Sequence, residues 1–295
     1  MKIAVYGREF QASVIPYVQH LFDSLTTRGA ELWIYGEFHD FLFQQQVVCP
    51  QGLNTYNAKE ELPDDIGFML SLGGDGTMLA AVSIVGDSGI PVAGINFGRL
   101  GFLADIGKDD IDAAMEAILR GEYDIQARTL VSVESSQTTL LEGSHFALND
   151  VTLFKSDSSA MITINAHING ELLNAYWADG IIIATPTGST AYSLSCGGPI
   201  LMPGSSNFVI TPISPHNLNV RPVVISDEVE LSLDIESRSG KFLLSCDSKT
   251  EAVSSDIRLT VKKAHYRANL IRLKNYRYFS TLRNKLLWGL DARNY

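Results

Sequence analysis

The hydrophobic pattern of this 295-residue chain changes near residue 125, and that change limits the folds open to it. Before it, apolar runs at 3–6, 31–35, 66–72 and 92–96 alternate with segments of helical spacing. The run at 66–72 lacks polar alternation, as expected of a parallel strand buried on both faces. The first part of the chain is therefore predicted to be a parallel sheet covered by helices.

The segments of helical spacing between these strands supply the predicted helices. Ser13 is predicted to cap the first helix and Gly29 to end it. Further helices are predicted at 77–85 and 111–120, whereas the stretch 36–65 shows no clear pattern and is predicted to be irregular. The apolar face of the first helix consists of Val14, Tyr17, Val18, Leu21, Phe22 and Leu25.

From about Thr129 the helical spacing disappears and short strands follow one another closely. Asn169-Gly170 is a strong hairpin signal, because a type I′ turn needs positive φ at both positions. We expect a mostly antiparallel β region, either a sandwich or stacked sheets. The predicted strands are 131–134, 147–154, 161–168, 172–177, 180–184, 209–213, 230–235, 242–245 and 257–261.

The length suggests two domains, although no linker marks the boundary between them. We predict an α/β domain at 1–127 and a β-rich domain at 128–267. Residues 268–295 are predicted to form a helical tail that packs on the first domain. The helical spacing of this tail rests on Phe279, Leu282, Leu286 and Leu287.

Composition excludes several classes of protein. With 45% hydrophobic and 19% charged residues, the chain is expected to fold rather than to be disordered. A net charge of -10 argues against a nucleic-acid partner or an anionic membrane surface. No run approaches the ~18 apolar residues of a membrane span. Cys49, Cys196 and Cys246 lack CxxC spacing, which favours a reducing cytoplasm over a disulfide framework or zinc cluster.

The sequence Gly73–Thr77, Gly-Gly-Asp-Gly-Thr, stands at the carboxyl end of the predicted strand 66–72, where open α/β sheets bind ligands. Glycines let the backbone approach a phosphate, and a helix N-terminus favours its negative charge. Asp75 would repel that phosphate unless it contacts a metal or accepts a proton from a hydroxyl being phosphorylated. The alternative is a turn in which Asp75 and Thr77 merely cap the helix.

A second glycine-rich segment, Gly94–Leu103, follows the next predicted strand at the same edge of the sheet. It is either a second loop beside Asp75 or simply a strand-to-loop reversal. The chain lacks the Lys-Ser/Thr of a Walker A motif and a GxGxxG after its first strand, which removes the two commonest nucleotide-binding signatures. The six histidines show no metal-ligand spacing.

Two segments of the β region also carry polar groups. Asn149 and Asp150 are neighbours, so in a regular strand only one of them can face a pocket. Residues 179–195 predict a buried strand that runs into a loop of small hydroxyl residues and then Tyr192. Hydroxyls suit ribose and phosphate oxygens, and an aromatic ring suits adenine. The alternative is a Ser/Thr-rich turn with a core tyrosine.

Together, these segments resemble NAD kinases, the family that phosphorylates the 2′-hydroxyl of the adenosine ribose of NAD to make NADP. The likeness covers 73–77, 94–103, 149–150, 179–199 and the tail 279–289. It implies that the open α/β domain at 1–127, of Rossmann or flavodoxin type, binds nucleotide and that the β-rich, sandwich-like domain at 128–267 binds NAD. It also implies a C-terminal helix that returns to the first domain. A lipid kinase of the same superfamily and a non-catalytic dinucleotide sensor are the alternatives.

The resemblance implies a cytoplasmic transferase that uses ATP or another phosphoryl donor and controls the NAD/NADP balance. It implies Mg²⁺ bound largely through ATP oxygens, with its protein ligands unassigned, and a homo-oligomer, either a dimer or a tetramer. The segment 258–295 holds ten basic residues and one acidic residue. Most of these charges are expected to be solvated or to pair with nearby acidic residues. The few nearest the nucleotide loops could offset the repulsion between two polyphosphates.

The resemblance also implies roles for single residues. Asp75 would be the general base, Asn149 and Asp150 would grip the NAD ribose, Asp179 would meet the other half of the dinucleotide, and Tyr192 would lie against adenine. Where many bacterial members carry Asp-Gly-Gln, this chain has Asp247-Ser248-Lys249. The implied binding residues are Gly73, Gly74, Asp75, Gly76, Thr77, Asn149, Asp150, Asp179, Thr190, Ala191, Tyr192, Ser193, Leu194 and Ser195.

Overall fold

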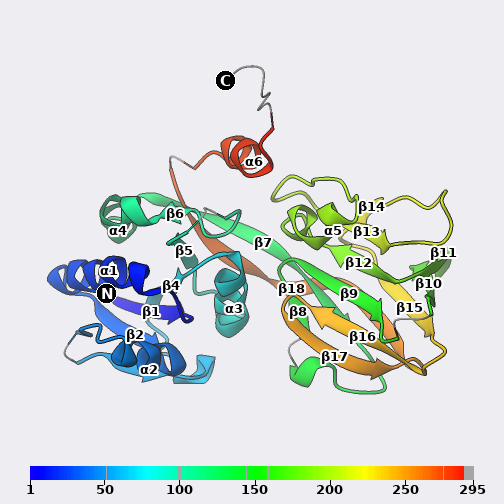
Figure 1. The fold of residues 1–295 in the computed structure, drawn as a ribbon, viewed down its shortest axis with the longest axis horizontal. Coiled ribbons are helices and arrows are strands. Elements are labelled where there is room, and N and C mark those ends of the chain that lie inside the picture. Colours follow the sequence, from blue (N-terminus) through cyan, green and yellow to red (C-terminus); the bar gives the residue numbers. More distant parts are fainter. Residues whose placement is uncertain (51, 99–100, 144, 158–159, 275, 289–295) are drawn as a thin grey trace. The chain divides into compact units, whose positions relative to one another are not determined.

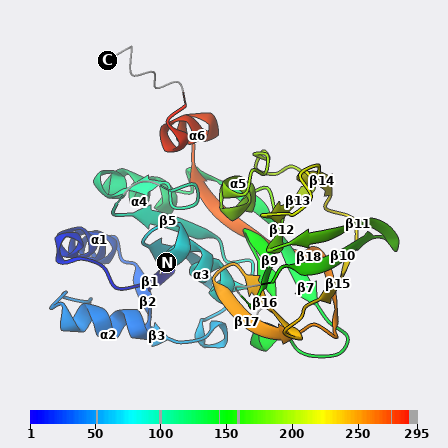
Figure 2. The same cartoon turned by 45° about the vertical axis from the view of Figure 1, so that its right-hand side comes forward.

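The structure, a computed structural model, describes the chain except residues 51, 99–100, 144, 158–159, 275 and 289–295. It divides into two compact units, the first made of Met1–Gln126 with Asn269–Tyr295 and the second of Ala127–Ala268. Figures 1 and 2 follow the chain through them in two views. Each unit has a hydrophobic core of its own.

Unit one is built on a parallel sheet with strand order β3-β2-β1-β4-β5. β6 and the end of β18 also pair with β5 in parallel. The residues of β4 and β5 are buried except Gly67, as predicted for strands covered on both faces. The strands are β1 (Lys2–Gly7), β2 (Glu31–Tyr35), β3 (Asn54–Tyr56), β4 (Ile66–Leu72), β5 (Val92–Asn96) and β6 (Ile106–Gly107).

Several helices of unit one pack apolar side chains into its core. In α1, Val18, Leu21, Phe22 and Leu25 are buried, as the spacing predicted. Gly29 follows this helix with φ +72°, the left-handed conformation that favours glycine after a helix end. The helices are α1 (Ile15–Thr27), α2 (Gly36–Gln44), α3 (Asp75–Val85), α4 (Ile111–Leu119) and α6 (Tyr278–Leu286).

Three predictions for unit one were wrong. The stretch predicted as irregular contains α2, which buries Phe38 and Leu42 one turn apart, as well as strand β3. Ser13 does not cap α1, because a 3₁₀ turn at Ala12–Val14 precedes this helix and its N-cap residue makes no side-chain hydrogen bond. The tail is not helical from residue 268, because β18 (Arg258–Leu273) continues first.

Unit two contains two antiparallel sheets that enclose one core, so the predicted sandwich-like fold is confirmed. One sheet has the order β11-β10-β15-β18, with β7 and β8 beside this path, and the other has the order β14-β13-β12-β9-β16-β17. The strands are β7 (Tyr123–Glu134), β8 (Phe146–Ala147), β9 (Asp150–Lys155), β10 (Ile162–Ile168), β11 (Glu171–Ala178), β12 (Gly180–Ala184), β13 (Asn207–Ile213), β14 (Val223–Ser226), β15 (Leu231–Glu236), β16 (Lys241–Cys246) and β17 (Lys249–Ser254).

The hairpin predicted in unit two is confirmed, whereas several strand bounds were wrong. Asn169 and Gly170 have φ of 50° and 86° and join β10 to β11. The predicted strand 147–154 is broken into β8 and β9 at residues 148–149. β14 and β17 were not predicted, because both are edge strands with few buried side chains and so lack a clear hydrophobic pattern.

Candidate active site

The glycine-rich segment of unit one lies where the sequence predicted, between the carboxyl end of β4 and the start of α3. The N–H of Gly73 donates to the carbonyl of Ile95 on the neighbouring strand (2.9 Å). A side chain at Gly73 would run into Thr77, whereas the positions of a Cβ at Gly74 and Gly76 are open space. Backbone is therefore accessible at these two glycines.

The carboxylate of Asp75 accepts hydrogen bonds from three consecutive backbone N–H groups. Phe102 donates to Oδ2 (2.9 Å), and Leu103 and Ala104 donate to Oδ1 (3.0 and 3.1 Å). A Cβ at Gly101 would overlap the same carboxylate. The second glycine-rich segment thus lies beside Asp75, while its residues Arg99 and Leu100 lie outside the described residues.

The simple capping alternative does not describe this segment. Asp75 is the first residue of α3, and the N-cap residue Gly74 makes no side-chain hydrogen bond. The Asp75 carboxylate is directed instead at the amides of residues 102–104, in a loop that is distant in sequence. These contacts orient the carboxylate at the edge where open α/β sheets bind their ligands.

Arg272, which sequence reasoning missed, holds the other side of the same loop. Its side chain is buried and pairs with Asp105 (2.7 Å). It also donates to the carbonyls of Leu103 (2.8 Å) and Phe102 (3.2 Å). One signal could have found it, because Arg272 is a charged residue in the otherwise apolar sequence Leu270–Leu273.

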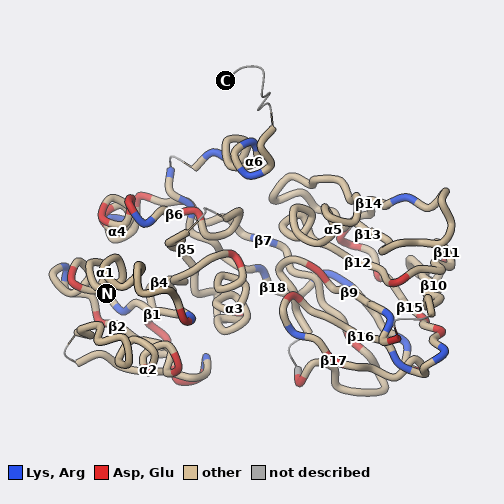
Figure 3. Tube along the Cα trace, in the orientation of Figure 1, with Lys and Arg blue, Asp and Glu red and all other residues tan. Residues whose placement is uncertain are grey.

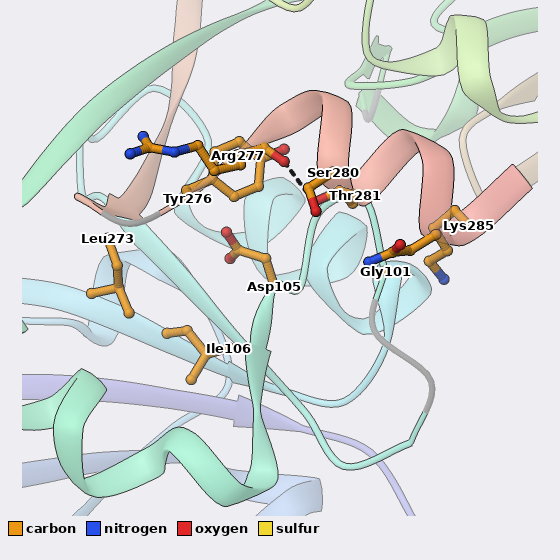
Figure 4. A pocket seen from close by; sticks show the side chains of 10 residues that line it. Gly101, Asp105, Ile106, Leu273, Tyr276, Arg277, Ser280, Thr281 and Lys285 are labelled. Atoms are coloured by element: carbon orange, nitrogen blue, oxygen red, sulfur yellow. Dashed lines mark hydrogen bonds between the residues drawn. The ribbon is translucent and has the colours of Figure 1, made fainter. Parts of the chain in front are cut away.

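A cavity of about 500 Å³ in unit one adjoins this loop, and Figure 4 shows residues that line it. Its walls include Gly101, Asp105 and Tyr276, together with Ser280 and Thr281 of α6. This volume falls in the range of small-molecule pockets. The basic segment 258–295 also contributes Arg277 and Lys285, which lie on opposite sides of the cavity in Figure 4. Figure 3 shows further where Lys and Arg residues lie along α6.

In unit two, the break between β8 and β9 is held by Asp247. The backbone N–H groups of Leu148, Asn149 and Asp150 donate to its carboxylate at 2.8, 2.8 and 3.2 Å. Asp247 occupies the turn between β16 and β17 with φ 50°, a conformation that Asp tolerates better than most residues. The first residue of the Asp-Ser-Lys sequence is therefore a backbone anchor for the predicted ribose-binding pair.

Asp150 is buried, with 8% of its surface exposed, and accepts a hydrogen bond from the Thr152 hydroxyl (2.8 Å). Burial raises the pKa of Asp150 to about 6; the Thr152 bond opposes this rise and the nearby Asp247 carboxylate adds to it. Burial also raises the pKa of Asp247, against the effect of its three amide bonds. Two carboxylates thus share one poorly solvated region beside Asn149.

The loop after β12 uses most of its hydroxyl groups to build its own structure. Thr185 donates to the carbonyl of Leu148 and accepts from the N–H groups of Thr187 and Gly188. Ser193 is fully buried and shares a hydrogen bond with Thr211 (2.8 Å). The hydroxyl of Ser193 therefore faces the protein interior, which corrects its expected position toward a ligand.

The remaining predicted residues of this loop are at least partly accessible. Tyr192 is 42% exposed, so the alternative of a core tyrosine is wrong. Its pKa is raised first by burial, then by the Cys196 thiol and by the negative charges of Asp150 and Asp179. The phenol thus lies within electrostatic reach of both carboxylates. Ser195 is exposed, whereas Thr190, Ala191 and Leu194 are half-buried.

Asp179 is half-buried and forms an ion pair with Lys155 (2.6 Å). Gly188 packs so closely on Asn149 that a Cβ there would overlap the Asn149 carbonyl. Unit two therefore brings the loop onto the predicted ribose-binding pair. Within the ranges that the structure describes, no group of three or more His, Cys, Asp or Glu side chains is placed to hold a metal.

Comparison with known proteins decides between the families that share a glycine-rich phosphate loop. Residues 13–123 match the family model of the ATP-NAD kinase N-terminal domain, and residues 148–273 match that of the ATP-NAD kinase C-terminal domain. The chain belongs to the NAD kinase family. It is 48% identical to an NAD kinase of Cytophaga hutchinsonii and 43% identical to one of Flavobacterium psychrophilum, each over 100% of both chains.

Solved structures of NAD kinases and their relatives share the fold. Yeast NADH kinase complexed with NADH has a TM-score of 0.84 at 23% identity and covers 99% of this chain and 89% of its own. An Archaeoglobus fulgidus NAD kinase in complex with ATP has a TM-score of 0.75 at 24% identity, over 97% and 99% of the two chains. In the described part of this family member, no helix has the length and apolar character that crossing a membrane requires.

Proposed function

We infer that the chain is an NAD kinase that transfers a phosphoryl group from ATP to the 2′-hydroxyl of the adenosine ribose of NAD, making NADP. Its full-length relatives carry the name NAD kinase, and structures of the same fold hold NADH or ATP. The observation that carries the chemistry is the Asp75 carboxylate, held by three amides beside an open glycine loop.

We propose that Asp75 is the general base. A carboxylate offers about four acceptor positions, and three are occupied by the amides of residues 102–104. The position that remains, on Oδ2, would accept the proton of the 2′-hydroxyl. A sugar hydroxyl is a poor nucleophile, and a positioned base contributes about 10²–10⁴-fold to the rate.

Other residues in the proposal bind substrate. The backbone at Gly73, Gly74 and Gly76, with Thr77, would hold phosphates at the N-terminus of α3, where the helix field favours anions. In unit two, Asn149 and Asp150 would bind the NAD ribose. The loop Thr190–Ser195 would place Tyr192 against adenine, and Asp179 would bind the other half of NAD. We propose that the two compact units are the corresponding functional domains.

A divalent cation, Mg²⁺ in this proposal, would neutralise phosphate charge and orient ATP for transfer. In this proposal ATP oxygens would hold most of the metal's coordination sites, and its protein ligands are unassigned. We also propose a cytoplasmic homo-oligomer, dimer or tetramer. Light scattering of the purified chain tests this assembly, and a monomer at micromolar concentration would contradict it.

The test is an assay of NADP formed from NAD, ATP and Mg²⁺. We expect Asp75→Asn to bind NAD like the wild type while kcat falls by about 10²–10⁴-fold, the usual contribution of a general base. Asp112→Asn is the matched control, because Asp112 also lies in the first turn of a helix but is largely exposed. Wild-type protein that binds NAD without making NADP would be a sensor, and phosphorylation of diacylglycerol instead would indicate a lipid kinase.

A further inference from the structure

Arg272 and Asp75 contact opposite sides of the same two peptide groups. In the peptide between Phe102 and Leu103, the carbonyl oxygen accepts a hydrogen bond from Arg272 (3.2 Å) and the N–H donates one to the Asp75 carboxylate (3.0 Å). The peptide between Leu103 and Ala104 does the same, with distances of 2.8 and 3.1 Å. A guanidinium and a carboxylate are therefore joined through two parallel peptide dipoles.

This arrangement strengthens both sets of hydrogen bonds. A cation at a carbonyl oxygen polarises its peptide, so that the N–H on the opposite side becomes a better donor. Leu103 and Ala104 are buried, with 3% and 0% of their surfaces exposed, so water does not screen these bonds effectively. Asp105 balances the charge of Arg272 at the end of the same loop (2.7 Å).

We propose that Arg272 is a positioning residue for phosphoryl transfer, which acts on Asp75 through the two peptides that follow Phe102 and Leu103. The inference rests on the general-base role proposed for Asp75. Arg272 fixes the donors that orient the Asp75 carboxylate and leave its remaining acceptor position toward the substrate hydroxyl. The side chain itself touches neither NAD nor ATP in this role.

The geometry requires arginine rather than any cation. Nη1 and Nη2 of the guanidinium donate to the carbonyls of Leu103 and Phe102. Nη1 also forms the ion pair with Asp105, and Nε donates to the side-chain oxygen of Gln126 (3.3 Å). A lysine ammonium is a single point charge and cannot reproduce this planar fork. The ring of Tyr276 covers the guanidinium at 4.8 Å, which further fixes its plane.

The first experiment compares Arg272→Met and Arg272→Lys with the control Arg258→Met. Arg258 lies on the same strand and forms a two-bond pair with Asp234, but it is 65% exposed. We expect Arg272→Met to lower kcat by about 10²-fold and to leave KM for NAD within about twofold, because misplaced catalytic groups affect turnover more than binding. Arg272→Lys is expected to lie between it and the wild type, and the control to match the wild type.

A double-mutant cycle with Asp75→Asn tests the route of the effect. If Arg272 acts through Asp75, adding Arg272→Met to Asp75→Asn changes kcat by less than about twofold. The proposal would be overturned if the double variant lost kcat by the product of the two single losses. Full activity of Arg272→Lys, or an effect of Arg272→Met on KM for NAD alone, would overturn it as well. Thermal unfolding of each variant separates loss of fold from loss of turnover, and Arg272→Lys carries the test if Arg272→Met does not fold.

Hydrogen exchange supplies a readout that is independent of activity. We expect the amides of residues 102–104 to exchange faster in both Arg272 variants than in the wild type, while those of β1 are unchanged. Unchanged exchange at residues 102–104 would refute the anchoring. If the wild type made no NADP, the proposed function would fail, whereas these amides would still report whether Arg272 fixes the donors of Asp75.

Discussion

Gly101→Ala should test whether the position of the Asp75 carboxylate matters for turnover, because this variant displaces the carboxylate and leaves Asp75 itself in place. The added Cβ would overlap Oδ1 of Asp75, and even the farther oxygen, Oδ2, would lie only 2.8 Å away. Atoms of these types do not approach so closely, so the carboxylate or the loop must move by about 1 Å or more. A displacement of this size at a catalytic group costs about 10²-fold in rate.

The assay is the initial rate of NADP formation at saturating NAD and ATP, with affinity for NAD measured separately by calorimetry. We expect kcat of Gly101→Ala to fall by about 10²-fold while its affinity for NAD stays near that of the wild type. Gly98→Ala is the control, since among the described residues its Cβ would meet Asn96 at an ordinary 3.7 Å. Wild-type turnover by Gly101→Ala would refute the requirement for a fixed carboxylate.

Two predictions concern unit two. Burial raises the pKa of Asp150 in the folded protein to about 6, so the folded state holds this proton more tightly than the unfolded state. The stability contributed by the bound proton is present in full below about pH 4 and is lost as the pH rises through 6. At pH 7.5 the folded protein must ionise the buried Asp150, and Asp150→Asn removes this cost of up to about 3 kcal/mol. The gain is reduced by about 1–2 kcal/mol, because the new amide leaves an N–H without a partner. Urea unfolding should therefore show a more stable variant at pH 7.5 and a smaller gain at pH 4.5, whereas a gain that grows toward low pH would contradict the assignment. Gly188→Ala places a Cβ 2.7 Å from the Asn149 Cα, so affinity for NAD should fall by about tenfold or more, a loss of about 1.4 kcal/mol or more, with little change in kcat. Calorimetry that found unchanged affinity would show that the packing of this loop on Asn149 does not shape the NAD site.

Hydrophobic periodicity predicted the elements that bury most of their surface. β4 and β5 were found because an uninterrupted apolar run has few other interpretations. α2 was missed because it has only two buried residues and a tyrosine at its N-cap, so neither a long apolar face nor a capping residue marks it. The end of β18 was missed because a strand that pairs with β5 has a partner far away in sequence.

The candidate site could be predicted only in part, because its supports are backbone groups. The position of Asp75 followed from a buried strand, a glycine turn and a helix, all local features of the sequence. Its three donors and the three donors to Asp247 are peptide N–H groups, which every residue except proline carries. No residue pattern identifies which amides will meet which carboxylate, so both anchors became visible only in the fold.

The return of the chain to unit one has a consequence for synthesis on the ribosome. Asp75 emerges early, but Leu270, which pairs with Val92, and Arg272, which holds the loop facing Asp75, are translated almost two hundred residues later. At about 5–20 residues per second, this interval lasts on the order of tens of seconds. Throughout it, the nascent chain carries Asp75 without the arginine that contacts the peptides donating to its carboxylate. With the roles proposed for Asp75 and Arg272, competence for turnover is acquired near the completion of translation, after the strands of unit two have been made.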